Sequence, residues 1–446
     1  MTARSDMSAI GGAAPVAPSE RYAILDILRG FALLGIAVAN FPEFSLYTFL
    51  PADAVGAMPT ARLDSVVRYL QYVFVDGKFY TVFSLLFGIG FSIILSNAAK
   101  RGADGLRVFY RRMVVLMLIG FLHLMFIWSG DILMLYALLG MLLPLFRKAS
   151  DRTLLMWAAA LLLLPVLVDA VTSAAGVSLS APVVALQRSC CARYGITDAN
   201  FAYWLRDARS YAEVFDFLVQ GALVRVQEFI DGNRYFKVLG LFLIGFCIGR
   251  RRLYADLERH RAVLVRIASV GLLFGLPFSC LYAWSAVSGR PFGVAVHSLL
   301  YLVSVYPVGF AYVACLCLFF MRCPGCRLFR LIAAPGRMAL TNYIGQSLCG
   351  MLIFYGIGFG LGADMGLVYV VLIAAGVWLV GALFSSLWLS AFRFGPLEWV
   401  WRMLTYGKVF PLRICRSVAE TGKLSGSIRL FRGRRLDSKS RKMPPA

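Results

Sequence analysis

The feature that most constrains this chain is a series of apolar runs long enough to cross a lipid bilayer. A membrane-spanning helix needs about 20 apolar residues, and runs of that length recur, for example at residues 24–44 and 366–391. The runs are continuous and do not alternate with polar residues, which disfavours membrane β-strands. Only 15% of the residues are charged, against about 25% in an average soluble domain. These features exclude a soluble enzyme and predict an all-α integral membrane protein.

Length and hydropathy predict about ten membrane-spanning helices. They are residues 24–44, 74–97, 110–128, 131–146, 154–175, 236–249, 263–287, 297–321, 338–361 and 366–391. The connections that follow the second, fourth, sixth and eighth spans are rich in Lys and Arg, and the other connections are not. By the positive-inside rule, both termini are expected on the cytoplasmic side.

Three segments lie outside the predicted spans of the membrane domain, residues 21–412. Residues 1–20 lack the apolar core of a signal peptide and are expected to be disordered. Residues 176–235 carry apolar residues at helical spacing from Phe201 to Phe229, which predicts an external amphipathic helix that either covers a site or simply caps the bundle. Residues 413–446 contain ten basic and two acidic residues. This cytoplasmic tail is expected either to contact anionic membrane lipids or to serve topology alone, and not to bind nucleic acid.

Ionisable side chains are costly inside a bilayer, so those within the spans are candidate functional residues. Asp26 and Arg29 stand three residues apart on the first span, and Asn40 lies nearly on the same face. One interpretation is that the three side chains line a binding site along one face of the helix. The other is that Asp26 and Arg29 only help to set the orientation of the span, beside a close helix contact at Gly30. Lys78, at the external end of the second span, either pairs with a neighbouring carboxylate or faces a cavity.

The sharpest constellation is His123 with Asp131. His123 lies on the third span, and Asp131 follows a short Ser-Gly turn that lets the chain fold back toward that span. A histidine with a carboxylate partner suits a general base, because imidazole titrates near neutral pH. The alternative is a neutral histidine that is hydrogen-bonded inside the bundle.

Two amides on the ninth span, Asn342 and Gln346, stand four residues apart on one face. They are candidates to line a ligand path or to join helices. Cys323 and Cys326 have C-x-x-C spacing, but no second pair accompanies them, so no metal is expected. The sequence contains no nucleotide-binding P-loop and no zinc-protease motif.

The chain resembles the YeiB family of bacterial inner-membrane proteins over about residues 20–412. The resemblance rests on five segments in order, at residues 25–40, 77–88, 120–140, 336–347 and 395–402. It implies a location in the bacterial inner membrane. The family is more remotely similar to transmembrane acyltransferases, which transfer an acetyl group from coenzyme A to a glycan on the other side of the membrane.

That remote similarity rests on Asp26, Arg29, Gly30 and Asn40, which resemble the first span of heparan glucosaminide acetyltransferase. In the acyltransferase-3 branch a catalytic histidine occupies the position of Asn40, so here His123 would have to supply the base.

Three functional hypotheses follow. The leading one is a membrane acyltransferase that takes an acyl-CoA, such as acetyl-CoA, from the cytoplasm, with Arg29 and Arg337 attracting its phosphates and Asn342 and Gln346 lining the path. His123, oriented by Asp131, would deprotonate the hydroxyl or amine of a small-molecule or glycan acceptor, and Lys78 or Asn40 would stabilise the oxyanion. The alternatives are a transporter of a small polar or lipid-linked solute, and a scaffold whose basic tail is the contact surface. The oligomeric state stays open.

Overall fold

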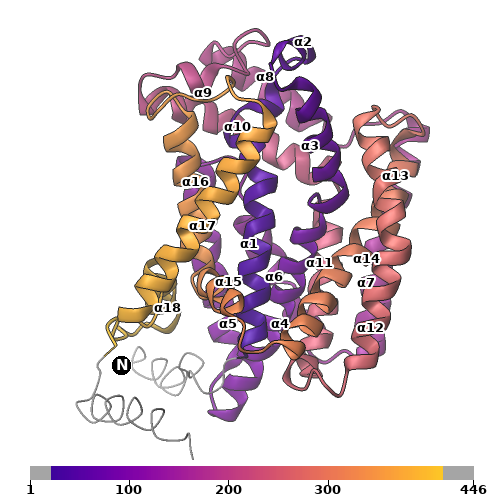
Figure 1. Ribbon diagram of the computed structural model, residues 1–446, viewed down its shortest axis with the longest axis vertical. Coiled ribbons are helices and arrows are strands. Elements are labelled where there is room, and N and C mark those ends of the chain that lie inside the picture. Colours follow the sequence, from indigo (N-terminus) through magenta and orange to yellow (C-terminus); the bar gives the residue numbers. More distant parts are fainter. Residues whose placement is uncertain (1–21, 415–446) are drawn as a thin grey trace, which may run out of the picture.

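A computed structural model describes residues 22–414 of the chain, and the predicted N-terminal lead-in and most of the basic tail lie outside these residues. The described part is a bundle of helices without a strand (Figure 1). The longer helices are α1 (Ala23–Phe44), α3 (Ala61–Phe74), α4 (Lys78–Lys100), α5 (Gly105–Phe126), α7 (Asp151–Ala175), α8 (Ala181–Tyr194), α10 (Tyr211–Asp231), α11 (Arg234–Arg250), α13 (Leu276–Val287), α14 (Gly293–Arg322), α16 (Ala339–Phe354) and α17 (Leu367–Ala391). The shorter ones are η2 (Tyr47–Phe49), α2 (Ala52–Ala57), α6 (Leu133–Gly140), η3 (Leu143–Phe146), α9 (Trp204–Asp207), η4 (Leu253–Ala255), α12 (Arg261–Val270), η5 (Gly271–Gly275), α15 (Arg327–Arg337) and α18 (Pro396–Tyr406).

Seven helical segments are long and apolar enough to cross a membrane. They are Ala23–Phe44, Ala61–Lys100, Gly105–Phe126, Asp151–Ala175, Arg261–Val287, Gly293–Arg322 and Leu367–Ala391. The other three predicted spans fall on shorter helices, namely α6 with η3, α11 and α16. The prediction of an all-α membrane protein is confirmed, and the total of ten spans stays a prediction.

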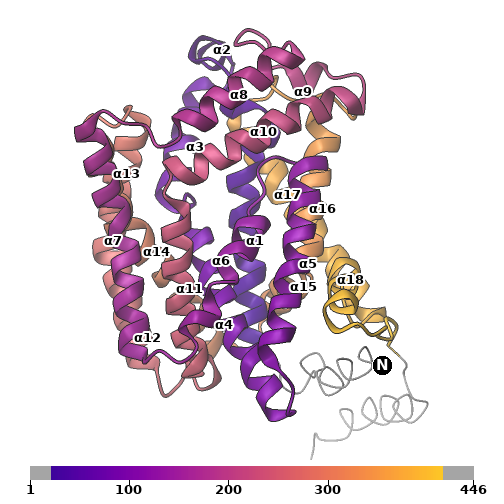
Figure 2. The same cartoon turned by 180° about the vertical axis from the view of Figure 1, so that it is seen from behind.

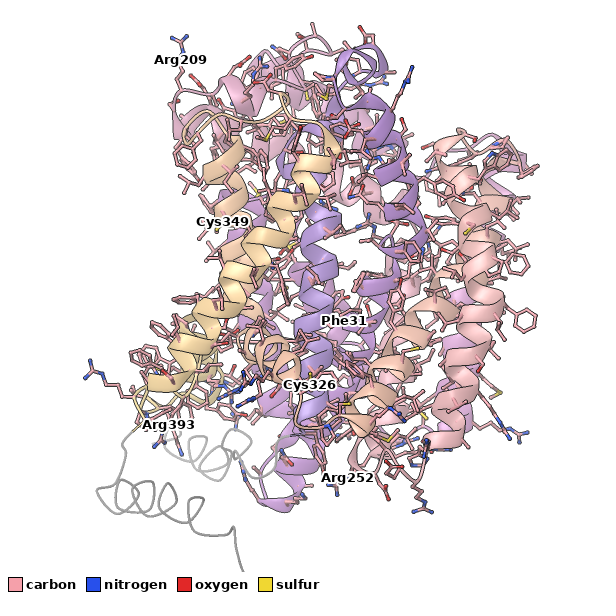
Figure 3. All side chains as sticks on the ribbon, in the orientation of Figure 1. Phe31, Arg209, Arg252, Cys326, Cys349 and Arg393 are labelled. Atoms are coloured by element: carbon pink, nitrogen blue, oxygen red, sulfur yellow. The ribbon has the colours of Figure 1, made fainter. Side chains whose placement is uncertain are left out.

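The connections that the sequence marks as basic share one end of the bundle, which is the lower end in Figures 1 and 3. Arg250, at the end of α11, contacts Asp151 at the start of α7, and Arg251 bonds the same carboxylate at 2.6 Å. Arg252 donates a hydrogen bond of 2.6 Å to the hydroxyl of Tyr22, just before α1. The start of α1 and the end of α18 therefore lie at the same end as these basic connections.

Helix α1 runs through the middle of the bundle and contacts α4, α14, α15, α16 and α17 (Figures 1 and 2). Its close contact with α15 depends on two glycines. A Cβ atom at Gly30 would collide with the carbonyl of Ile332, and one at Gly336 would collide with the carbonyl of Asp26. Backbones approach this closely only where small residues face each other, so these glycines hold Arg337 beside the start of α1.

Helices α4 and α11 also contact each other through glycines. Gly88 faces the backbone of Phe242, and Gly245 faces that of Leu85. The nearby Gly90 has no such neighbour within 4 Å and lines a cavity instead. Helix α4 is thereby fixed with one face against α11 and another toward the interior of the bundle.

The segment 176–235 forms three helices, where the sequence predicted one long amphipathic helix. Helices α8 and α10 cross the upper end of the bundle (Figure 2). The helical conformation is interrupted at residues 208–210, because Ser210 caps a new helix. Its hydroxyl accepts a hydrogen bond of 3.4 Å from the Glu213 amide. The break changes the helical phase, so α10 buries Val214 and Phe217, whereas Val226 of the predicted apolar face is exposed.

No helix was predicted at the positions of α2, α3, α15 and α18. Helix α3 contacts α13 and α17. Its buried Asp64 accepts a hydrogen bond of 2.9 Å from the Val368 amide and so caps α17. The ninth predicted span was too long, because α16 ends at Phe354. Residues 355–366 turn back, and the backbone amide of Ala363 donates a hydrogen bond of 2.8 Å to the carbonyl of Ser45.

Candidate functional site

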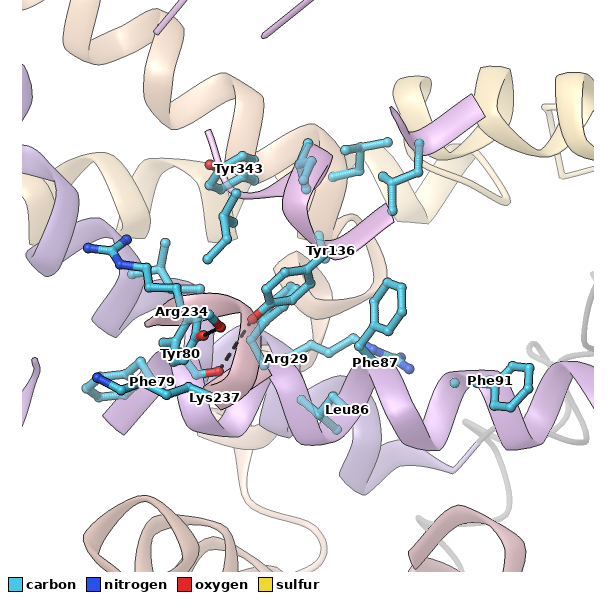
Figure 4. Close-up of a pocket in the computed structure, with 18 of the residues that line it drawn as sticks. Arg29, Phe79, Tyr80, Leu86, Phe87, Phe91, Tyr136, Arg234, Lys237 and Tyr343 are labelled. Carbon is cyan, nitrogen blue, oxygen red and sulfur yellow. Dashed lines mark hydrogen bonds between the residues drawn. The ribbon is translucent and has the colours of Figure 1, made fainter. Parts of the chain in front are cut away.

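A cavity of about 1330 Å³ runs between α1, α4, α5, α6, α11 and α14. Its wall changes character along its length. The lower part is lined by Asp26, Arg29, Arg112, Arg337, Glu398 and Arg402. The middle part is lined by Phe79, Phe83, Leu86, Phe87, Met113, Leu133 and Tyr136, several of which Figure 4 shows. The upper part is lined by Glu43, Tyr72, Asp76, Asp169, Arg225, Glu228, Asp231, Arg234, Lys237, Tyr282, Arg290, His297 and Tyr301.

In the lower part, the predicted Asp26 and Arg29 form an ion pair of 2.9 Å across one turn of α1. Arg112 of α5 lies beside them, with its guanidinium carbon 3.8 Å from the centre of the Trp401 ring. Among residues 22–414, no carboxylate forms an ion pair or hydrogen bond with the Arg112 guanidinium. The charges that act most strongly on it include Arg402 and Arg29, which repel it, and Glu398.

Glu398 is bound to α16. Its carboxylate accepts hydrogen bonds from the amide of Leu340 at 2.7 Å, and from the amide and hydroxyl of Thr341 at 3.1 and 2.6 Å. These amides belong to the first turn of α16, so Glu398 caps that helix from α18. Burial raises the pKa of Glu398, and the hydrogen bonds from Thr341 and Leu340 only partly oppose the rise.

The structure brings His123 and Asp131 together. Nδ1 of His123 lies 2.9 Å from the Asp131 carboxylate, whose second oxygen accepts a bond of 2.8 Å from the Met134 amide at the start of α6. Nε2 of His123 lies 2.9 Å from the hydroxyl of Ser347 on α16. Gly120 permits this geometry, because a Cβ there would lie 2.6 Å from the Met134 nitrogen. The order Asp, His, Ser matches the hydrogen-bond order of a catalytic triad.

This triad-like group lies behind the cavity wall. His123, Asp131 and Ser347 are each 1% exposed and are absent from the lining, which includes the neighbouring Ile132. Tyr343 separates them from the cavity, with its ring 5.2 Å from that of His123. Its buried hydroxyl has no hydrogen-bond partner among the described residues.

A second charged group lies above the triad. Arg225 of α10 donates hydrogen bonds to the carbonyl of Ser129 at 3.0 Å, to Glu43 at 3.1 Å and to Glu228 at 2.5 Å. Burial would lower the pKa of Arg225, but the attraction of Glu43 and Glu228 outweighs it, and the pKa is raised. Arg225 thus ties α10 to α1 and to the turn that precedes Asp131.

The upper part of the cavity contains Asp169, which the sequence analysis did not single out, and Asp76, the carboxylate that neighbours Lys78 in the sequence. Asp169 of α7 accepts a hydrogen bond of 2.7 Å from Asn233 and another from Ser298. Asp76 accepts one of 2.7 Å from the hydroxyl of Tyr282. A signal for Asp169 was present, because it is the one carboxylate in the apolar run 154–175.

Three of the predicted binding residues do not line the cavity. Lys78 is buried, and its ammonium donates a hydrogen bond of 2.6 Å to the carbonyl of Tyr72. Asn342 faces α17 and donates to the hydroxyl of Ser385 at 2.8 Å. Gln346 is 6% exposed and is also absent from the lining.

None of Lys78, Asn342 and Gln346 therefore lines the cavity, and their roles at an oxyanion and along a ligand path stay predictions. Asn342 joins α16 to α17, which is the alternative that the sequence left open, and the Lys78 ammonium is bound to a backbone carbonyl. Asp26, Arg29, Asn40 and Arg337 do line the cavity.

The fold and the cavity define a helical membrane protein whose bundle encloses a long chamber with charged ends. Residues 248–408 match the family described as "Protein of unknown function (DUF418)". The chain is 31% identical over 402 residues to the uncharacterized protein YxaH of Bacillus subtilis (strain 168), covering 88% of this chain and 96% of that protein. It is 29% identical over 421 residues to the uncharacterized protein YeiB of Escherichia coli (strain K12), covering 86% and 96%.

The chain therefore belongs to the YeiB-like DUF418 family, which confirms the resemblance seen in the sequence. No solved structure matches it.

Proposed function

We propose that this protein is a membrane acyltransferase that binds an acyl-CoA in the lower part of the cavity and an acceptor in the upper part. The observation that carries the proposal is Arg112, a cation that faces the cavity beside Arg29 and Arg402 and has no carboxylate bound to it within residues 22–414. Like charges repel more strongly in a low-dielectric interior than in water. An anionic ligand such as the phosphates of coenzyme A would relieve that repulsion.

The shape of the cavity supports an elongated ligand. Above the arginines, the middle part is lined by apolar and aromatic side chains, including Phe83 and Phe87. A pantetheine arm carrying a short acyl group would fit such a passage, because this arm is narrow, flexible and largely uncharged. Its thioester would then point to the upper part of the cavity, where the charged and tyrosine side chains would receive a polar acceptor.

In the proposed reaction, the acceptor oxygen or nitrogen attacks the thioester carbonyl and loses its proton to His123. The carbon–sulfur bond breaks, and the leaving thiolate takes up the proton. Asp131 would stabilise the imidazolium through the bond to Nδ1. Because His123 is 1% exposed, this role requires Tyr343 to move and Ser347 to release Nε2 when the substrates bind.

Binding of acetyl-CoA to the purified protein in nanodiscs tests the proposal without knowledge of the acceptor. Saturable binding is expected, and Arg112→Gln should weaken it at least about tenfold, since one hydrogen bond to a charged group contributes about 1.5–3 kcal/mol. Arg393→Gln is the matched control, because Arg393 is exposed at the same end (Figure 3). A folded preparation that binds no acetyl-CoA would refute the proposal.

A transporter is the second candidate, because charged side chains line both ends of the cavity. Counterflow of a solute in proteoliposomes, without any acylated product, would favour it. For either function we propose the bacterial inner membrane, with the basic lower end in the cytoplasm according to the positive-inside rule.

A further inference from the structure

The upper part of the cavity contains a cation without an anionic partner. Lys237 of α11 lines the cavity, and its ammonium lies 4.0 Å from the centre of the Tyr301 ring. This ammonium forms no hydrogen bond or ion pair with any residue of the described range 22–414. Figure 4 shows it beside Arg234 and Tyr80. A cation–π contact contributes only about 0.5–2 kcal/mol and does not neutralise the charge.

Carboxylates and cations are mixed in the upper part of the cavity, which is lined by Glu43, Asp76, Asp169, Glu228 and Asp231 and by Arg225, Arg234, Lys237 and Arg290. The four groups that act most strongly on Lys237 are Arg234, Arg290, Asp76 and Asp169. Neither Asp76 nor Asp169 forms an ion pair with the Lys237 ammonium, so that charge has no bound anion within the described residues 22–414. The two carboxylates already accept hydrogen bonds from neutral donors, namely Asn233 and Ser298 for Asp169 and Tyr282 for Asp76.

Two further carboxylates of the upper end, Glu43 and Glu228, form ion pairs with Arg225. Glu228 reaches Arg234 only at 3.9 Å. Arg290 is exposed, lies in the connection between α13 and α14, and lines the same cavity. Lys237 therefore points into the chamber, and Arg290 stands at its rim.

We infer that the upper part of the cavity binds an anionic group, a phosphate or a carboxylate, between Lys237 and Arg290. This site is separate from the arginines of the lower part, so the cavity holds two anions at once. In the proposed acyl transfer the second anion belongs to the acceptor, and that assignment rests on the proposed function. The anion site itself stands on the residues of the chamber alone. Its source is either a phospholipid headgroup or a soluble anion.

Protection of Lys237 from acetylation tests the site with inorganic phosphate as the probe. The protein carries Arg112→Gln to weaken the lower site, sits in phosphatidylcholine nanodiscs and is treated with acetic anhydride, and modification is read by peptide mass spectrometry. Phosphate at twice its dissociation constant should slow Lys237 acetylation about threefold. Lys148, which is exposed and does not line the cavity, is the internal reference, and its acetylation should not respond to phosphate.

A second variant separates binding from accessibility. Arg290→Gln should reduce the protection of Lys237 and leave its acetylation rate without phosphate similar. Protection in phosphatidylglycerol nanodiscs without added phosphate would support the site and identify a lipid headgroup as the source. Acetylation of Lys237 that neither phosphate nor phosphatidylglycerol slows would overturn the inference. Acetyl-CoA binding to the protein with Arg112 intact is unaffected by that result and tests the proposed function separately.

Discussion

His123 uses both ring nitrogens, so its substitution affects chemistry and packing together. Under the proposed function, His123→Gln should abolish acyl transfer while acetyl-CoA binding stays within about twofold, because the phosphate site lies on other residues. Asp131→Asn should slow transfer strongly, because it removes the charge that stabilises the imidazolium. The measurements are transfer from radiolabelled acetyl-CoA and acetyl-CoA binding by the same preparation. Full transfer by a folded His123→Gln protein would refute the catalytic assignment.

Substitution of Ser347 tests whether its hydroxyl takes part in the reaction or only holds His123 in place. Ser347→Ala removes one buried hydrogen bond to His123 and should cost about 1 kcal/mol of stability. If Ser347 only holds the imidazole in place, transfer should persist at a reduced rate. Complete loss of transfer by a folded protein with unchanged acetyl-CoA affinity would show that the serine takes part in the reaction.

Glu398 makes stability depend on pH in a defined direction. Its pKa is raised in the folded protein, so the folded state binds the proton more tightly than the unfolded state. The contribution of Glu398 to stability is therefore greatest when it is protonated and falls as pH rises from about 4.5 through the folded-state pKa. The melting temperature of the wild type relative to Glu398→Gln should fall over that range. A pH-independent difference between the two proteins would contradict the raised pKa.

At the scale of elements, the contact between α1 and α15 sets the position of the lower cavity wall. Gly336→Ala would place a methyl group on the carbonyl of Asp26, and overpacking of this kind costs about 1–3 kcal/mol. The variant should melt at lower temperature and bind acetyl-CoA more weakly, because Asp26, Arg29 and Arg337 move apart. Gly376→Ala on α17 is the matched control, since a Cβ there meets nothing within 4 Å. Equal behaviour of the two variants would contradict this role for the helix contact.

The elements that the sequence predicted well are those whose signal is local. Long apolar runs specify α1, α7, α14 and α17, because burial in lipid depends on composition alone. Helix α15 was missed because its arginines were interpreted as a basic connection, although Phe329, Ile332 and Gly336 recur at helical spacing and form its buried face.

The same distinction holds for the candidate site. The short turn before Asp131 made its return to His123 predictable from local sequence. Ser347 lies 224 residues from His123 in the sequence, so no local sequence pattern could predict their contact. The orientation of Asn342 was decided by Ser385 on a neighbouring helix. Arg112 was interpreted as part of a basic connection. Its position in the cavity wall became visible only with the packing of Trp401 against its guanidinium.

For the whole molecule, the basic lower end predicts the orientation in the membrane. The start of α1 and the end of α18 share that end (Figure 1), and Arg209 and Arg393 lie exposed at opposite ends (Figure 3). If the positive-inside rule holds, Arg209 faces the outside and Arg393 the cytoplasm. A maleimide that cannot cross membranes should therefore label Arg209→Cys in intact spheroplasts, in a background whose native cysteines are replaced by serine. Arg393→Cys should be labelled only after the cells are permeabilised. The reverse pattern would place the arginines of the lower cavity away from cytoplasmic acyl-CoA, and the donor would then have to enter through the opposite end.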